Sequence, residues 1–152
     1  MRVFIVYIII AMLAISLQST IFPHIKPDLA LILVCLYSLR GGEIRGMVLG
    51  AIVGLLIDSV SGFIIGPNIL SKSIVGFLFN IIRQKFFFWN AFLNTLMVAI
   101  FSIIDTFIVR ITLEAFLGVS FSSMALKTAI IAVLYTTMAG LIAYLVFKPK
   151  VL

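Results

Sequence analysis

Few ionisable side chains occur in this 152-residue sequence, and those inside its apolar segments are the first candidates for chemistry. Asp58, Asp105, Arg110 and Glu114 all lie within long apolar stretches, where an unpaired charge is costly. Such side chains can form proton or cation sites, contact a ligand, or make buried ion pairs. Lys72 follows Asp58 in the next apolar segment and could reach back to it.

Asp58 has several polar neighbours, so the sequence favours a buried hydrogen-bonding anchor over a titrating centre. We expect Asp58 near the middle of an apolar segment over residues 46–65, close to the bilayer midplane. Its candidate partners are Ser59, Ser61, Asn68 and Lys72. A proton or cation site and a ligand contact stay open as alternatives, because a carboxylate at that depth must be neutral, paired or hydrated.

The apolar segment over residues 91–117 carries the other three ionisable groups. Arg110 and Glu114 are four residues apart, so they share one helix face and are expected to form an interfacial salt bridge. Asp105 lies about 140° around the helix from Arg110. It is therefore predicted to point into the bundle as a second intramembrane acid.

No arrangement of residues typical of catalysis occurs in the sequence. It has neither an HExxH motif nor a glycine-rich phosphate loop, and its single histidine and single cysteine cannot form a metal cluster. The serines beside Asp58 have no histidine at the same depth to act as a base. We expect no catalytic residue, no metal and no cofactor, with His24 in a solvated turn and Cys35 as a small apolar residue.

The amino-acid composition is that of a membrane protein. Hydrophobic residues make up 64% of the sequence and charged residues 11%, against about 45–50% and about 25% in soluble domains. The net charge of +6 is interpreted as anchoring to membrane lipid, not as nucleic-acid binding. Residues 1–152 are expected to form a single integral membrane domain, because no segment is long enough for a soluble catalytic domain.

Six continuous apolar segments predict an all-α bundle of six transmembrane helices. The segments cover residues 3–22, 29–39, 46–65, 69–82, 91–117 and 128–147. A spanning helix needs about 20 residues, so the second and fourth segments are short and must tilt, borrow flanking residues or enter the membrane only partly. The aromatic run 86–89 beside Arg83 and Lys85 is typical of a headgroup anchor.

The distribution of basic residues predicts that both termini are cytoplasmic. With six spans, seven basic residues fall on the cytoplasmic side and three on the outer side, in line with the positive-inside rule. The first group is Arg2, Arg40, Arg45, Arg83, Lys85, Lys148 and Lys150, and the second is Lys26, Lys72 and Lys127.

Small residues recur at every fourth position along the third apolar segment. This glycine stripe, which includes one aspartate, consists of Gly46, Gly50, Gly54, Asp58, Gly62 and Gly66. Glycines four apart form a groove that lets another helix approach closely. The groove could pack against another helix of this chain or receive a helix from a partner protein, and the sequence leaves both open.

Several short motifs together resemble the rod shape-determining protein MreD family. They are Lys26-Pro27-Asp28-Leu29, Leu39-Arg40-Gly41, Asp58-Ser59-Val60-Ser61-Gly62, Gly66-Pro67-Asn68-Ile69-Leu70-Ser71-Lys72 and Val75-Gly76-Phe77. The resemblance extends over residues 26–95 and is most specific between Asp58 and Gly76. It implies that Asn68, Lys72 and Gly76 join the glycine stripe in a motif that binds a partner or supports the structure.

The resemblance also implies a function. Proteins of this family are expected to be non-enzymatic components of the bacterial cell-elongation machinery in the cytoplasmic (inner) membrane. The chain would bind MreC, a bitopic protein with a periplasmic domain, and through it connect to the MreB filament, the RodA glycosyltransferase and its partner transpeptidase. The bundle would be similar to the six-helix substrate-binding subunits of energy-coupling-factor transporters.

Two functions from different classes are therefore open. In a scaffold, the glycine stripe and the two short segments would form a groove for the transmembrane helix of MreC. In a small-ligand-binding transporter subunit of the vitamin-uptake kind, Asp58, Asn68, Lys72 and Asp105 would line a cavity. The aromatic run 86–89 lies on the predicted cytoplasmic side instead of converging on a pocket, which favours the scaffold. A proton channel would rest on the two buried acids alone.

Overall fold

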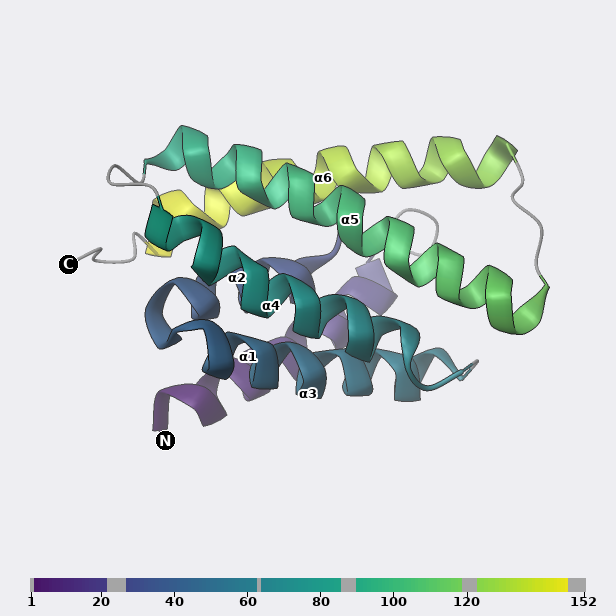
Figure 1. Cartoon of the computed structure of the whole chain (residues 1–152), viewed down its shortest axis with the longest axis horizontal. Coiled ribbons are helices and arrows are strands. Elements are labelled where there is room, and N and C mark those ends of the chain that lie inside the picture. Colours follow the sequence, from purple (N-terminus) through teal and green to yellow (C-terminus); the bar gives the residue numbers. More distant parts are fainter. Residues whose placement is uncertain (1, 22–26, 63, 86–89, 119–122, 148–152) are drawn as a thin grey trace.

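The described part of the chain forms a bundle of six helices and contains no strand. The structure, a computed structural model, describes residues 2–21, 27–62, 64–85, 90–118 and 123–147. The helices are α1 (Arg2–Ile21), α2 (Leu29–Gly41), α3 (Glu43–Ser61), α4 (Pro67–Lys85), α5 (Ala91–Leu117) and α6 (Ser123–Phe147). Figure 1 shows these helices packed along roughly one direction. The prediction of an all-α fold with six helices is confirmed.

The helix boundaries differ from the expected segments mainly around the Gly-Pro pair. α3 ends at Ser61, because Gly62 adopts a left-handed conformation with φ 69° and donates its N–H to the Asp58 carbonyl. Pro67 begins α4 instead of separating two segments, since proline is favoured in the first turn of a helix. α4 therefore has 19 residues and is not a short segment. α6 begins at Ser123, earlier than expected.

Three of the described helices are long and apolar enough to cross a membrane by themselves. They are Glu43–Ser61 of α3, Ala91–Phe116 of α5 and Lys127–Val146 of α6. α1 and α2 contain the shorter apolar stretches Val3–Gln18 and Leu29–Gly41, and α4 carries three cations. The structure supports a membrane protein, but the expected crossing by all six helices is supported for these three only.

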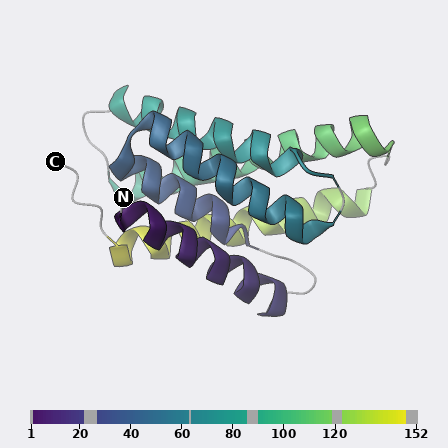
Figure 2. The same ribbon diagram turned by 90° about the horizontal axis from the view of Figure 1, so that it is seen from below.

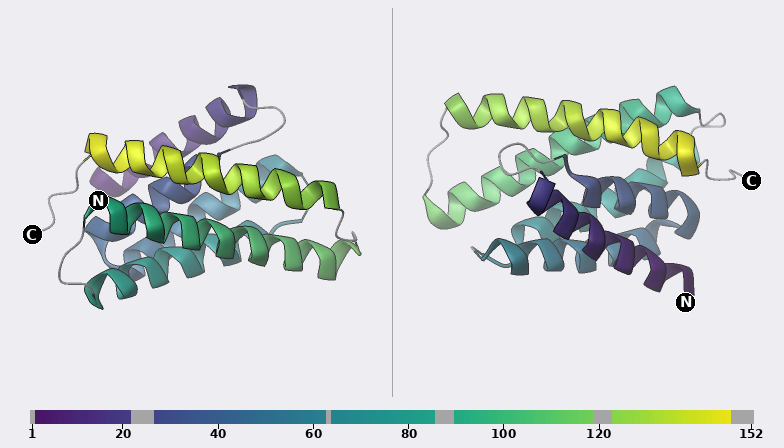
Figure 3. Two further views of the ribbon diagram at one scale, coloured as in Figure 1. Left: turned by 90° about the horizontal axis from the view of Figure 1, so that it is seen from above. Right: turned by 180° about the vertical axis from the view of Figure 1, so that it is seen from behind.

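α2 is the central helix of the bundle. It has 13 residues, about 20 Å of helix, and nine of its side chains are buried. It contacts each of the other five helices, while α3 packs against α4 and α5 packs against α6. Figure 2 shows α1 at an edge of the bundle, and both views in Figure 3 show α5 beside α6. The short second segment is therefore an inner helix surrounded by longer ones.

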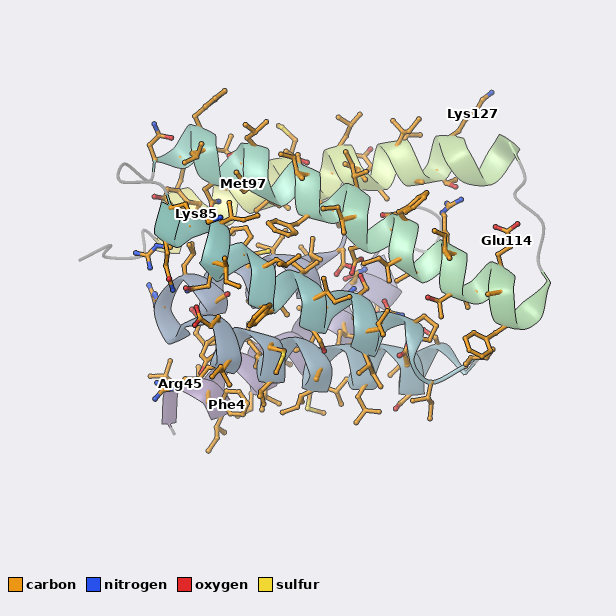
Figure 4. The ribbon with its side chains drawn as sticks, viewed as in Figure 1. Phe4, Arg45, Lys85, Met97, Glu114 and Lys127 are labelled. Atoms are coloured by element: carbon orange, nitrogen blue, oxygen red, sulfur yellow. The ribbon has the colours of Figure 1, made fainter. Side chains whose placement is uncertain are left out.

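The two ends of the bundle differ in charge. α1 begins and α6 ends at the same end (Figure 1), which we call the basic end because Figure 4 places Arg45 and Lys85 there. Glu114 and Lys127 lie at the opposite end (Figure 4). This arrangement agrees with an even number of spans. The predictions made for His24, Lys26, residues 86–89, Lys148 and Lys150 fall outside the described residues.

The glycine stripe of α3 is filled by α4. The closest backbone contacts pair Gly46 with Gly76, Gly50 with Lys72 and Gly54 with Asn68. A Cβ atom added at Gly50 would lie only 2.1 Å from the backbone oxygen of Lys72. Gly62 and Gly66, with positive φ angles of 69° and 142°, belong instead to the turn that follows α3. A helix of the same chain occupies the groove, so the alternative in which the groove receives a partner's helix does not hold.

Adding one methyl group at Gly50 tests the direct contact between the two backbones. Gly50→Ala should destabilise the bundle by about 1–3 kcal/mol or prevent folding, because the new Cβ atom collides with the Lys72 carbonyl. The control Val60→Ile adds one methyl group on the same helix where the side chain is 69% exposed, and should leave the melting temperature unchanged. Thermal unfolding of the full chain in detergent micelles is the measurement. Equal stability of Gly50→Ala and the unaltered chain would contradict the contact.

Candidate functional site

The centre of the bundle holds a buried lysine. Lys72 on α4 is 1% exposed, and its ammonium group meets carboxylates from two other parts of the chain. The Nζ atom lies 2.8 Å from Oδ2 of Asp28 and 3.2 Å from Oδ1 of Asp105. It also donates to Oδ1 of Asn68 at 3.3 Å. An ammonium group removed from water is tolerated only when it is paired in this way.

Asp28 fixes the start of α2 inside the bundle. As the N-cap residue it accepts a hydrogen bond from the Leu31 N–H at 2.8 Å. Its own N–H donates to the Thr136 hydroxyl on α6, also at 2.8 Å. Asp28 was not among the site residues expected from the sequence. An aspartate directly before an apolar run is a helix N-cap signal, which could have identified this carboxylate.

Asp105 on α5 supplies the second carboxylate. Asp105 is 6% exposed, and the Ser71 hydroxyl donates to its Oδ1 atom at 2.5 Å. The Nζ atom of Lys72 lies within 3.3 Å of both Asp105 oxygens. Asp105 therefore points into the bundle, as its angular distance from Arg110 predicts. We call Asp28, Lys72 and Asp105 the ion network.

Asp58 closes the turn between α3 and α4. It is 3% exposed and accepts four hydrogen bonds from the residues that begin α4. The donors are the N–H groups of Gly66 (2.9 Å), Asn68 (3.2 Å) and Ile69 (3.3 Å) and the side-chain amide of Asn68 (2.7 Å). The hydroxyls of Ser59 and Ser61 bond instead to carbonyls of their own helix. Of the expected partners, Asn68 contacts Asp58, while Lys72 pairs with other carboxylates.

The position of Asp58 also corrects an expectation. Asp58 lies in the last turn of α3, which ends at Ser61, and not in the middle of a segment. The early end of the helix is the physical reason, because Gly62 closes α3 by bonding to the Asp58 carbonyl. The side chain of Asp58 thus caps α4, and its backbone carbonyl accepts the hydrogen bond that closes α3.

The charges of these groups are balanced locally. Asp28 and Asp58 each lie at a helix N-terminus, where the partial positive charge of the helix dipole stabilises a carboxylate. Lys72 neutralises Asp105 and is shared with Asp28. Through these contacts and Thr136, five helices, α2 to α6, are joined. The arrangement holds the helices in fixed positions, because each of these carboxylates is paired with a cation or accepts hydrogen bonds from helix N–H groups.

A polar cavity of about 270 Å³ borders the ion network. Its polar lining residues are Gln18, Asp28, Ser61, Asn68, Ser102, Asp105, Thr106 and Thr136. Four residues were expected to line a ligand cavity, and of these Asn68 and Asp105 do so. Lys72 and Asp58 are buried in the contacts described above.

A second polar contact joins α2 to α4 nearer the basic end. The Ser38 hydroxyl donates to the Gly76 carbonyl at 2.6 Å, and the Asn80 side-chain amide donates to the Ser38 carbonyl. Sequence reasoning missed both Ser38 and Asn80. The signal was available, because Asn80 follows Lys72 and Gly76 at the same four-residue spacing.

The other candidate residues lie apart from the ion network. Glu114 is exposed near the end of α5 (Figure 4), and Arg110 lines a groove between α5 and α6. The salt bridge between them stays a prediction. Cys35 is buried in the core as a free thiol. Among the described residues, no group of three metal-binding side chains occurs.

Comparison with known proteins identifies a family. The family model of the rod shape-determining protein MreD matches residues 1–145. Comparisons with curated proteins and with solved structures gave no match. The match covers more of the chain than the residues 26–95 that carry the sequence resemblance. The expected similarity to substrate-binding subunits of energy-coupling-factor transporters finds no support in these comparisons.

Removing the buried ammonium group tests the ion network. Lys72→Met leaves Asp105 buried without its cation, and breaking a buried ion pair from one side costs about 3–5 kcal/mol. The double variant Lys72→Met/Asp105→Leu leaves only the partly exposed Asp28 carboxylate without its cation and should recover part of that stability. Chemical unfolding in detergent is the measurement, with Lys127→Met at an exposed position as the matched control. A single variant as stable as the unaltered chain would show that the pair contributes nothing.

Two substitutions at Asp58 separate a structural role from a charge-dependent one. Asp58→Ala loses all four hydrogen bonds to the start of α4 and should cost at least about 1–2 kcal/mol. Asp58→Asn keeps one acceptor oxygen and should cost less. Thermal unfolding ranks the variants, with Ser59→Ala at the exposed neighbouring position as control. Normal folding of both variants together with equal, complete loss of function would favour a charge-dependent role instead.

Proposed function

We propose a function that proceeds from one finding: the chain belongs to the rod shape-determining protein MreD family. Family membership gives a role in the determination of rod shape. We infer that the chain is a non-enzymatic scaffold of the bacterial cytoplasmic membrane. It binds MreC and, through MreC, is linked to the MreB filament and to peptidoglycan synthesis by RodA and its partner transpeptidase. The commitment of the ion network and of Asp58 to structural contacts supports a scaffold over an enzyme.

The proposed orientation has both termini in the cytoplasm. The basic end holds Arg45 and Lys85, and it is also where α1 begins and α6 ends (Figures 1 and 4). Arg83 belongs to the same end, because it donates to the Leu39 carbonyl near the end of α2 at 3.0 Å. Basic residues are concentrated on the cytoplasmic side of membrane proteins. The basic end is therefore assigned to the cytoplasm.

The proposed contact with MreC lies on α5 and α6. The glycine stripe is covered by α4, so a partner's helix needs another lateral face, and the face of α5 and α6 is the candidate. An apolar groove of about 260 Å³ runs between α5 and α6. Phe107 and Leu134 in this groove are each 60% exposed, and the small side chain of Ala129 lies between the helices. Small residues flanked by large apolar ones allow a transmembrane helix to approach closely.

A small-ligand-binding transporter subunit is the second candidate, and the polar cavity is the observation in its favour. Asp105 and Asn68 line this cavity beside several hydroxyl groups. Its volume of about 270 Å³ lies just below the range of roughly 300–1,000 Å³ that is usual for small-molecule sites. Small-molecule sites are also lined mainly by apolar and aromatic side chains, whereas most residues that line this cavity are polar. The scaffold is therefore the better supported function.

Photo-cross-linking tests both the partner and its docking face. A photoreactive amino acid at Leu134 or Phe107 should form an adduct with MreC in membranes of the native host, because both side chains face outward from the α5–α6 groove. The matched control is Leu13 on α1, which is 64% exposed and should give no such adduct. Mass spectrometry of the purified adducts and of co-purified proteins and small molecules is the measurement.

The outcomes of this experiment are distinct. An MreC adduct from Leu13 and none from Leu134 would keep the partner and move the contact to α1. Absence of MreC from the adducts and from the co-purified proteins would reject the scaffold. Recovery of an ATPase module or a stoichiometric small molecule would establish the transporter subunit instead.

A further inference from the structure

A groove at the basic end of the bundle takes no part in either candidate function. It has a volume of about 660 Å³ and is formed where α1 begins, α2 ends and α3 begins. Two arginines, Arg40 and Arg45, line it together with apolar and aromatic side chains. Both arginines are exposed and lie on either side of the turn at Gly42. The groove therefore combines positive charge with an apolar surface.

One wall of the groove is held rigidly by aromatic packing. The Tyr37 side chain is 5% exposed, and its ring lies 5.8 Å from the ring of Phe4 and 5.0 Å from that of Tyr7. A Cβ atom at Gly41 would lie 3.0 Å from the Tyr37 ring, so the glycine lets the ring pack against the end of α2. The wall is thus part of the folded core.

The charged side of the groove is suited to an anion. Besides the two guanidinium groups, the N-terminus of α3 lies there, and its N-cap Gly42 makes no side-chain capping hydrogen bond. Unsatisfied N–H groups and the helix dipole attract anions at such a terminus. Glu43, the acidic residue of this first turn, is bonded to the Gln84 amide of α4 at 3.0 Å and does not line the groove. The planar guanidinium group of arginine can donate two parallel hydrogen bonds to the oxygens of a phosphate group.

The apolar side of the groove continues from the arginines along the surface of the bundle. Ile44 is 66% exposed, Val48 42% and Val3 58%, and all three line the groove. α3 is one of the helices able to span the membrane, and it begins at Glu43. Arg45 in its first turn therefore lies at the level of the lipid headgroups. Val48, about one turn further along, lies closer to the acyl chains.

We propose that this groove binds an anionic phospholipid of the surrounding leaflet. The phosphate group lies between Arg40 and Arg45, and one acyl chain follows Ile44 and Val48. A zwitterionic lipid fits less well, because its own cationic group opposes the arginines and the N-terminus of α3. Basic pockets between transmembrane helices are suited to anionic headgroups for the same electrostatic reason. This inference does not depend on the proposed partner.

Native mass spectrometry of the full chain tests the proposal. The chain is purified in detergent and offered phosphatidylglycerol and phosphatidylcholine in equal amounts. The unaltered chain should retain phosphatidylglycerol preferentially. The double variant Arg40→Gln/Arg45→Gln should bind it about thirtyfold more weakly, which is the effect of two cations near a lipid headgroup. Lys85→Gln, which removes an exposed cation at the same end but outside the groove, should retain the preference.

Three results would overturn the proposal. One is undiminished retention by the double variant, and another is an equal loss in Lys85→Gln, which would mean general attraction to the basic end. The third is equal thermal stabilisation by soluble glycerol phosphate, which would mean that the acyl chain makes no contact. The melting temperature of the single variant Arg45→Gln in phosphatidylcholine alone distinguishes a loss of lipid binding from a loss of folding. This variant should melt like the unaltered chain and still bind phosphatidylglycerol more weakly.

Discussion

A lysine buried inside an apolar bundle constrains everything that packs around it. Lys72 can remain charged only while carboxylates lie within hydrogen-bonding distance, and these come from the start of α2 and from α5. Asp28 must therefore enter the bundle, which accounts for a short α2 that begins inside the protein. Asp105 must face α4, which fixes the rotation of α5. A buried ion pair adds little net stability over an apolar core, so we interpret its role as the selection of one helix arrangement.

The contact between α3 and α4 places that lysine. Residues at every fourth position of α3 meet residues at every fourth position of α4 running in the opposite direction. At Gly50 the backbone of Lys72 lies against α3, while its side chain extends away from α3 to the ion network. The same contact therefore brings the two backbones close together and positions the ammonium group. Asp58 fixes where this pairing begins, because it caps α4 directly after the turn.

Sequence reasoning predicted the features that depend on local pattern, and missed those that depend on tertiary contact. The six helices and the burial of Asp105 follow from apolar runs and helical spacing. The end of α3 was missed because Gly62 fits the four-residue repeat, although its positive φ belongs to a turn. The partners of Lys72 were missed because Asp28 is 44 residues away along the chain. The sequence pattern of a glycine stripe is the same whether the helix packed on it belongs to this chain or to a partner protein. Only the fold could therefore assign the stripe to α4.

The placement of polar groups also determines how such a protein can meet a partner. The buried side chains of Asp58, Lys72 and Asp105 are engaged in hydrogen bonds and ion pairs, and large apolar side chains of α1, α5 and α6 are exposed on the lateral faces. Lipid is as apolar as those faces, so burying them against a partner gains little from the hydrophobic effect. Recognition must then come from close steric fit along the helices and from charged groups at the ends. Steric fit requires a surface of fixed shape, and the ion network, together with Asp58 and Thr136, supplies that rigidity by joining five helices. The polar chemistry of this chain is therefore most useful inside it, where it holds the outer apolar surface in one form.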